Sequence, residues 1–146
     1  MTEVTLEDIA VSGDENQFLV LLKGPEGDLL PIVIDAMQAL AIAAGRAGEG
    51  PGRPLTHDLI QHIFTGLEVS LDHIIINDVQ DGTFFARIFL TMKNELGTKI
   101  LELDARPSDS IVLALQSGKP IYVLRKVLDE VEDMTELLER ILKEEN

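Results

Sequence analysis

Two short polar motifs of similar composition occur in this chain. The first is RPLTHDLI, Arg53–Ile60, and the second is DARPSDSIVLAL, Asp104–Leu115. In each motif an arginine and a proline precede a hydroxyl residue, Thr56 or Ser108, which we expect to cap a helix with an aspartate in its first turn. Helix starts present unpaired backbone N–H groups and partial positive charge, so the two motifs together could bind a phosphate or a metal ion.

The aspartates of the motifs are candidate metal ligands. Asp58, Asp104 and Asp109 offer the carboxylate oxygens that hold Mg²⁺ or Mn²⁺ in phosphoryl chemistry. In the simpler alternative, Asp58 and Asp109 only complement their helix dipoles and Asp104 only ends a strand. The repetition of the pattern favours a shared site.

Histidine supplies the candidate proton carrier. His57 lies within the first motif, and imidazole is the side chain best suited to general acid–base catalysis at neutral pH. His62 follows on the same predicted helix without metal-binding spacing, and His73 lies in a run of isoleucines. We therefore expect His62 and His73 to be surface or packing residues.

The two arginines have two competing roles. Arg53 and Arg106 could bind phosphate and stabilise the charge of a phosphodiester-cleaving transition state. Alternatively, Arg53 would pair with Asp109, and Arg106 with Asp58 or Asp104, in a closed structural network that does no chemistry. The spacing leaves both alternatives open.

Composition limits the class of protein. The chain has 146 residues, 45% of them hydrophobic, which suits one domain with a sizeable core. It has no cysteine, which excludes disulfides and thiolate metal sites, and its net charge of −14 opposes the basic surface of a protein that grips nucleic acid through many phosphates. No signal sequence or membrane-length apolar run is evident, so we expect a cytoplasmic protein without membrane contact.

Hydrophobic periodicity predicts an α+β fold, a mainly antiparallel sheet packed with three to four helices in a single domain. The expected strands cover Val4–Val11, Phe18–Leu22, Leu29–Ile34, Val69–Val79, Thr83–Met92, Thr98–Leu103 and Ile121–Leu124. The expected helices begin at the Asp35/Gln38 capping box and end at Gly45, run from Thr56 to about Thr65, run from Ser108 to Gly118, and continue from Lys126.

Three local signals refine this layout. Pro31 cannot donate to a strand ladder, which predicts that its strand lies at an edge or begins irregularly, and Asp81 with Gly82 predicts a tight hairpin. The final segment is amphipathic, and a break near Asp133 is an alternative to one continuous helix. Its apolar stripe comprises Val127, Val131, Met134, Leu138 and Ile141.

At the two polar motifs and at several other segments, the chain resembles the bifunctional nuclease domain family. The resemblance is carried by LPIVI at Leu30–Ile34, RPLTHDL at Arg53–Leu59, the turn Asp81–Gly82, DARPSDSI at Asp104–Ile111 and KPIYV at Lys119–Val123. It covers about residues 4 to 124, so we predict a nuclease-like domain over residues 1–124 and a helical extension over 125–146.

The resemblance implies a compact α+β fold, self-association, and a proposed DNase and RNase activity for which a divalent metal is a candidate requirement. The polar positions typical of the family fall on Arg53, Thr56, His57, Asp58, Asp104, Arg106, Ser108 and Asp109.

Three functional hypotheses follow. The first is a metal-assisted nuclease in which Asp58, Asp104 and Asp109 hold Mg²⁺ or Mn²⁺, His57 moves the proton, and Arg53 with Arg106 stabilises charge. The second is a non-enzymatic interaction module, a homo-oligomer and most simply a dimer, with the motifs as an internal polar network and the C-terminal helix as the docking surface. The third is a small-anion-binding protein that uses the two helix starts, including Thr56 and Ser108.

Overall fold

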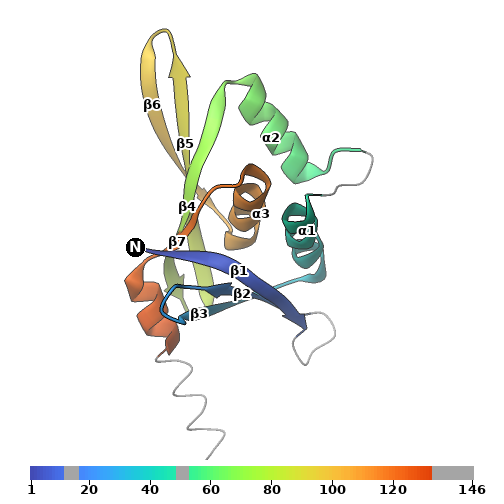
Figure 1. Ribbon diagram of the computed structural model, residues 1–146, viewed down its shortest axis with the longest axis vertical. Helices are drawn as coiled ribbons and strands as arrows, with labels where there is room; N and C mark the ends of the chain where they lie inside the picture. Colours follow the sequence, from blue (N-terminus) through green and yellow to red (C-terminus); the bar gives the residue numbers. More distant parts are fainter. Residues whose placement is uncertain (12–16, 49–52, 133–146) are drawn as a thin grey trace, which may run out of the picture.

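The computed structural model describes residues 1–11, 17–48 and 53–132, and these residues form the predicted α+β architecture (Figure 1). Within them, seven strands make one sheet in the order β3-β2-β1-β7-β4-β5-β6. All neighbouring strands are antiparallel except β4 and β7, which are parallel. The strands are β1 Thr2–Val11, β2 Phe18–Lys23, β3 Leu29–Ile34, β4 Val69–Gln80, β5 Thr83–Asn94, β6 Gly97–Ala105 and β7 Ile121–Val123.

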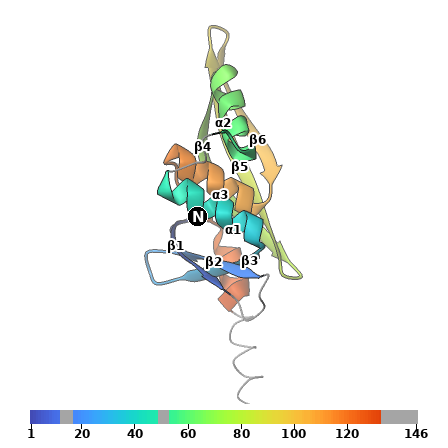
Figure 2. The same cartoon turned by 90° about the vertical axis from the view of Figure 1, so that its right-hand side faces the viewer.

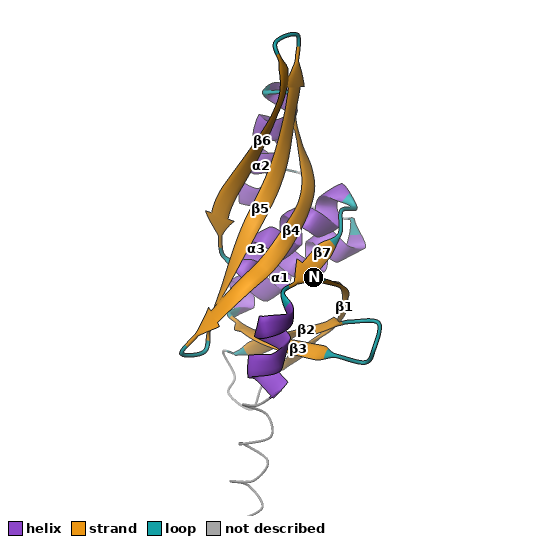
Figure 3. Cartoon of the chain, turned by 90° about the vertical axis from the view of Figure 1, so that its left-hand side faces the viewer, coloured by secondary structure: helices purple, strands orange, loops and turns teal. Residues whose placement is uncertain are grey.

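Helices α2 Thr56–Gly66 and α3 Pro107–Ser117 pack on one face of the long strands β4 and β5, and α1 Ala36–Ala47 packs against α3 and β2 (Figures 1 and 2). The opposite view shows β4 and β5 in front of these helices (Figure 3). Helix α3 packs against both α1 and α2 and against the sheet. Its central position explains why its body, predicted to be apolar all round, is buried from Ile111 to Ala114.

The local turn signals act as predicted. Strand β3, which contains Pro31, lies at one edge of the sheet. Asp81 and Gly82 both have positive φ, 52° and 81°, as the tight hairpin between β4 and β5 requires. This hairpin and the following one align the long strands beneath α2 and α3.

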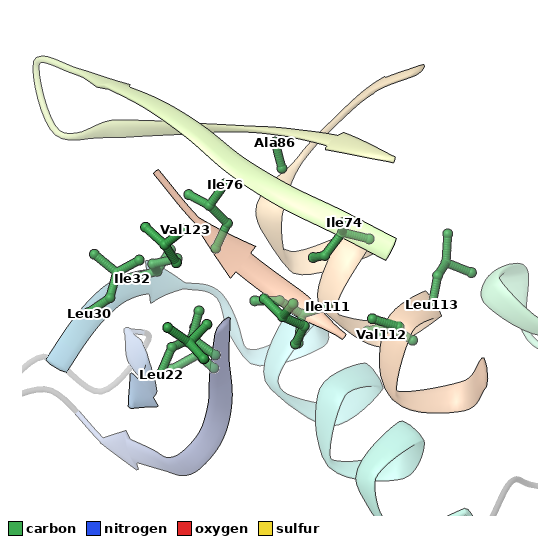
Figure 4. Close-up of a cluster of buried hydrophobic side chains, with 14 of the residues drawn as sticks. Leu22, Leu30, Ile32, Ile74, Ile76, Ala86, Ile111, Val112, Leu113 and Val123 are labelled. Atoms are coloured by element: carbon green, nitrogen blue, oxygen red, sulfur yellow. The ribbon is translucent and has the colours of Figure 1, made fainter. Parts of the chain in front are cut away.

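The core joins strands β2 and β3, strands β7, β4 and β5, and the central helix α3 (Figure 4). Leu22 and Leu30 from β2 and β3 are fully buried, as are Ile74 and Ile76 from β4. On β5 the buried residues alternate at Ala86, Ile88 and Leu90, which is the predicted inward face. The fold therefore fixes the backbone of α3 from several sides.

The C-terminal segment begins as an amphipathic helix. Residues 125–132 are helical, and Val127 and Val131 are buried as the apolar stripe predicts. Asp133 and the remaining stripe residues, Met134, Leu138 and Ile141, lie outside the described residues. Across the described residues, no helix has the length and apolar character needed to cross a membrane.

The prediction that Gly45 ends α1 is wrong. The helix continues to Ala47, and Gly48 is the left-handed C-cap with φ 70°. A Cβ at Gly45 would lie 3.5 Å from the carbonyl oxygen of Val112. Gly45 thus lies where α1 approaches the backbone of α3 closely.

Candidate functional site

The two sequence motifs meet at the starts of α2 and α3. The Nε2 atom of His57, in the first turn of α2, lies 2.8 Å from Oδ1 of Asp109 in the first turn of α3. Arg106, immediately before α3, donates from Nε to Oδ2 of Asp109 at 2.9 Å and from Nη2 to Oδ1 at 3.4 Å. One carboxylate therefore joins a histidine from one motif to an arginine from the other.

Partial burial strengthens this three-residue cluster. The side chain of His57 is 18% exposed and that of Asp109 is 31% exposed, whereas Arg106 is 65% exposed. Desolvation alone would raise the pKa of Asp109, but hydrogen bonds and charge from Arg106 and His57 outweigh it and lower that pKa. The Asp109 hydrogen bond also raises the pKa of Arg106. Asp109 is therefore a stable carboxylate and Arg106 a permanent cation.

The cluster fixes the hydrogen-bonding state of His57. An ionised carboxylate only accepts hydrogen bonds, so the His57 Nε2 atom that faces Asp109 carries the proton. In neutral His57, Nδ1 then bears the free lone pair, and no other described residue hydrogen-bonds to it. This arrangement suits an imidazole that accepts a proton at Nδ1.

The structure corrects the predicted cap of α3. The N-cap is Arg106 because Pro107 takes the first helical position, for which its missing N–H and fixed φ suit it. Ser108 is instead inside the helix and buried at 4% exposure, where its hydroxyl accepts a hydrogen bond from Gln38 Nε2 at 2.8 Å. Ser108 links α3 to α1 and does not cap its own helix.

The predicted cap of α2 is also wrong. Thr56 is the first helical residue, and Leu55 occupies the N-cap without a side-chain hydrogen bond. Asp58 takes part of the capping role, since its Oδ2 accepts from the Leu55 backbone N–H at 2.8 Å. The other oxygen of Asp58 accepts from Gln116 of α3 at 3.2 Å. These contacts match the simpler alternative, in which Asp58 has a structural role at the start of its helix.

Glutamines that the sequence did not single out join the helices. Gln61 of α2 donates to the backbone carbonyl of Leu113 at 3.3 Å and to Ser117 Oγ at 3.0 Å, both on α3. Gln116 of α3 donates to Asp58 of α2, and Gln38 of α1 donates to Ser108 of α3. No sequence pattern near the motifs predicts these glutamine contacts, because the glutamines meet their partners only once the helices have packed together.

The remaining candidates lie apart from the cluster. Asp104 is on the exposed strand β6, opposite Arg87 of β5. Arg53 is exposed and has no ion pair with any described residue. The predicted cross-pairs of Arg53 with Asp109 and of Arg106 with Asp58 or Asp104 are therefore wrong, since Arg106 pairs within its own motif.

The other histidines match their expected roles. His62 is exposed on α2. His73 stacks on Phe89 with ring centroids 4.5 Å apart and lies 2.8 Å from an Asp72 oxygen. Neither lines a cavity with His57.

The described side chains do not fit the predicted three-carboxylate metal site. Within residues 1–11, 17–48 and 53–132, no group of three or more His, Asp or Glu side chains is arranged to hold a metal ion. Both oxygens of Asp109 are engaged by His57 and Arg106, and both oxygens of Asp58 by the backbone and Gln116. We therefore derive no reaction step through a bound metal.

Two adjoining cavities flank His57. One, of about 440 Å³, lies between α1 and the starts of α2 and α3, and Arg106 and Asp109 also line it. The other, of about 230 Å³, continues past His57 towards Asp58 and Gln116. Leu55 and Val112 line both, so the cluster faces a continuous groove and not a closed core.

Comparison with known sequences identifies the family of this chain. The bifunctional nuclease domain model matches residues 20–136, and the chain belongs to this family. The match continues beyond residue 124 and includes the start of the C-terminal helix.

Individual relatives agree with this membership. The uncharacterized proteins MT1877 and Rv1829 of two Mycobacterium tuberculosis strains are each 42% identical over 129 residues, covering 88% of this chain and 74% of theirs. Bifunctional nuclease 2 of Oryza sativa subsp. japonica is 23% identical over 120 residues, covering 82% of this chain and 37% of its own length.

Proposed function

We propose that this protein is a cytoplasmic nuclease that hydrolyses phosphodiester bonds in DNA or RNA at the groove beside His57. The observation that supports the proposal is the pair of bonds from His57 and Arg106 to Asp109, since all three residues line one cavity and their side chains suit proton transfer and phosphate binding. Membership of the bifunctional nuclease domain family supports the same chemistry.

The reaction follows from the roles these groups can take. The Nδ1 atom of His57 removes a proton from a water molecule, whose oxygen bonds to phosphorus as the bond to the leaving sugar oxygen breaks. The imidazolium then returns the proton to that leaving oxygen. Asp109 holds the imidazole in position through the Nε2 hydrogen bond, while the Arg106 N–H groups not bound to Asp109 contact the phosphate.

Mg²⁺ or Mn²⁺ remains a proposal for the cofactor. The described carboxylates are committed to other partners, so an ion would have to arrive with the phosphate of the substrate or displace one of those partners. Cleavage assays with each cation and with a chelator test this proposal. Loss of cleavage on chelation, with recovery in Mn²⁺, would support a metal requirement, and full activity in the chelator would contradict it.

The nuclease proposal is tested with labelled single-stranded DNA and RNA. His57→Gln removes the proton carrier and is expected to lower kcat at least about 100-fold. His62→Gln is the matched control, an exposed histidine on the same helix that should retain wild-type activity. Absence of cleavage under every metal condition, or equal activity of His57→Gln and wild type, would refute the proposal.

A second function, self-association, is favoured by a separate observation on α2. Leu59 and Ile63 lie one turn apart on the helix, Leu67 follows at its C-cap, and these side chains are 56%, 49% and 61% exposed. We infer that this stripe contacts a second copy of the chain in a dimer. Sedimentation should show a dimer that Ile63→Asp dissociates, and a monomeric wild type would contradict this inference.

The third hypothesis, binding of a small anion, is compatible with the same groove. Inorganic phosphate would then raise the melting temperature of a protein that cleaves no nucleic acid.

A further inference from the structure

The groove beside the His57 cluster has a strongly apolar wall. Helix α1 contributes Met37 and Leu40 to the larger cavity, and Leu55 lies across from them at the start of α2. These side chains are 75%, 67% and 51% exposed, although each borders a partly buried ionic cluster. Exposed apolar surface around a few polar groups is typical of a small-ligand site.

The size of the larger cavity limits what it can take. Its volume is about 440 Å³, within the usual range for small-molecule sites and suited to one nucleoside. A nucleobase has apolar faces and polar edges, and the lining of this cavity likewise combines apolar residues with the polar residues Thr56 and Gln38, of which Gln38 is already bonded to Ser108 and to the Asp35 backbone. The hydroxyl of Thr56 makes no hydrogen bond with any described residue and is free for a ligand.

Charge limits the length of nucleic acid that can bind. Among α1, α2 and α3, the helices that border the groove, Arg46 is the single lysine or arginine. Arg106 is the single lysine or arginine lining the larger cavity, and Asp109 and Asp58 supply negative charge along the groove. Tight binding of a long strand needs many phosphate contacts, which a chain of net charge −14 with this groove does not provide.

We propose that the substrate of this site is a short, single-stranded phosphodiester of dinucleotide scale, with one base in the cavity beside Leu40 and its phosphate between Arg106 and His57. This inference rests on the proposed nuclease function and names its substrate class. Recognition comes from one base and one phosphate, so extra nucleotides add little to binding.

The experiment compares kcat/KM per bond for a dinucleotide and for a long single strand, each over a range of salt concentrations. We expect the two values to agree within about ten-fold. For the long strand, the slope of log kcat/KM against log salt should be near −0.7 to −1.4, since each phosphate contact on a single strand contributes about −0.7. Cleavage of the long strand alone, or a slope equivalent to many phosphates, would overturn the inference while leaving the nuclease function intact.

Leu40→Asp tests the base cavity directly. A carboxylate on the apolar wall should raise KM for the dinucleotide about ten-fold or more and leave kcat near wild type. Ala43→Asp adds the same charge to an exposed position of α1 outside both groove cavities and should change neither constant. Equal KM values for these two variants would overturn the assignment.

Competition with product analogues separates base recognition from phosphate recognition. Adenosine or uridine monophosphate should inhibit cleavage at least ten-fold more strongly than inorganic phosphate, and Leu40→Asp should remove the difference. Equal inhibition by nucleotide and phosphate in the wild type would overturn base recognition. Failure of the wild type to cleave any substrate would instead refute the nuclease proposal itself.

Discussion

Replacement of Asp109 by asparagine tests whether this carboxylate joins the two motifs. The His57 bond is worth about 1.5 kcal/mol, because His57 is only 18% exposed and hydrogen bonds to charged groups contribute about 1.5–3 kcal/mol. The Arg106 pair adds about 0.5 kcal/mol, since Arg106 is 65% exposed and solvent screens the charges. The first-turn position of Asp109 contributes about 0.3–1 kcal/mol through the helix dipole.

Asparagine keeps one acceptor oxygen but loses the charge. We therefore expect Asp109→Asn to lower the free energy of unfolding by about 1.5–2 kcal/mol, the larger part of these three contributions. Urea denaturation measures this as a lower midpoint with an unchanged m-value.

The matched control is Asp104→Asn, in the same sequence motif. Asp104 is exposed on β6 and has no ion pair with any described residue, so its replacement should change the free energy of unfolding by less than about 0.5 kcal/mol. The reasoning is refuted if Asp109→Asn is as stable as wild type, or if Asp104→Asn is equally destabilising.

Further predictions concern pH, the helix contacts and the candidate metal ligands. Folding lowers the pKa of Asp109, so the stability that this carboxylate contributes is present above its unfolded pKa of about 3.9 and is lost as pH falls through the lower folded pKa. Urea denaturation should therefore show that the difference in free energy of unfolding between wild type and Asp109→Asn shrinks on acidification. A difference that does not change with pH would contradict this. Gln116→Ala should lower the free energy of unfolding by about 0.5–1.5 kcal/mol, because Gln116 loses its hydrogen bond to Asp58. The variant should keep the wild-type kcat in the cleavage assay. A large fall in kcat would instead indicate that Asp58 takes part in the reaction. Asp104→Ala should cleave at a rate within about three-fold of wild type in Mg²⁺ or Mn²⁺, because the substitution removes no contact to the transition state. A greater loss of rate would support Asp104 as a metal ligand.

The sequence predicted the sheet well because its signals are local. The edge position of β3 follows from Pro31, and the β4–β5 hairpin from Asp81 and Gly82. The alternation along β5 identified its buried face. The convergence of the two motifs was also correct, as the His57–Asp109 bond shows.

The errors arose where packing overrides local chemistry. Gly45 resembles a helix stop, but its lack of a side chain serves the close approach of α1 to α3. Ser108 resembles a cap, but Pro107 moves the cap to Arg106 and leaves Ser108 buried against Gln38. The structural alternative paired the arginines across the two facing motifs, whereas Arg106 reaches the aspartate of its own helix.

The choice between a reactive cluster and a purely structural network depends on whether His57 and Asp109 act as one unit in cleavage. The most direct measurement is a double-mutant cycle on kcat/KM for single-stranded substrate, with His57→Gln, Asp109→Asn and the double variant. Residues that act as a unit have non-additive effects, so we predict that the double variant cleaves within about three-fold of His57→Gln alone. Wild-type rates in both single variants, or losses that multiply in the double variant, would contradict the account.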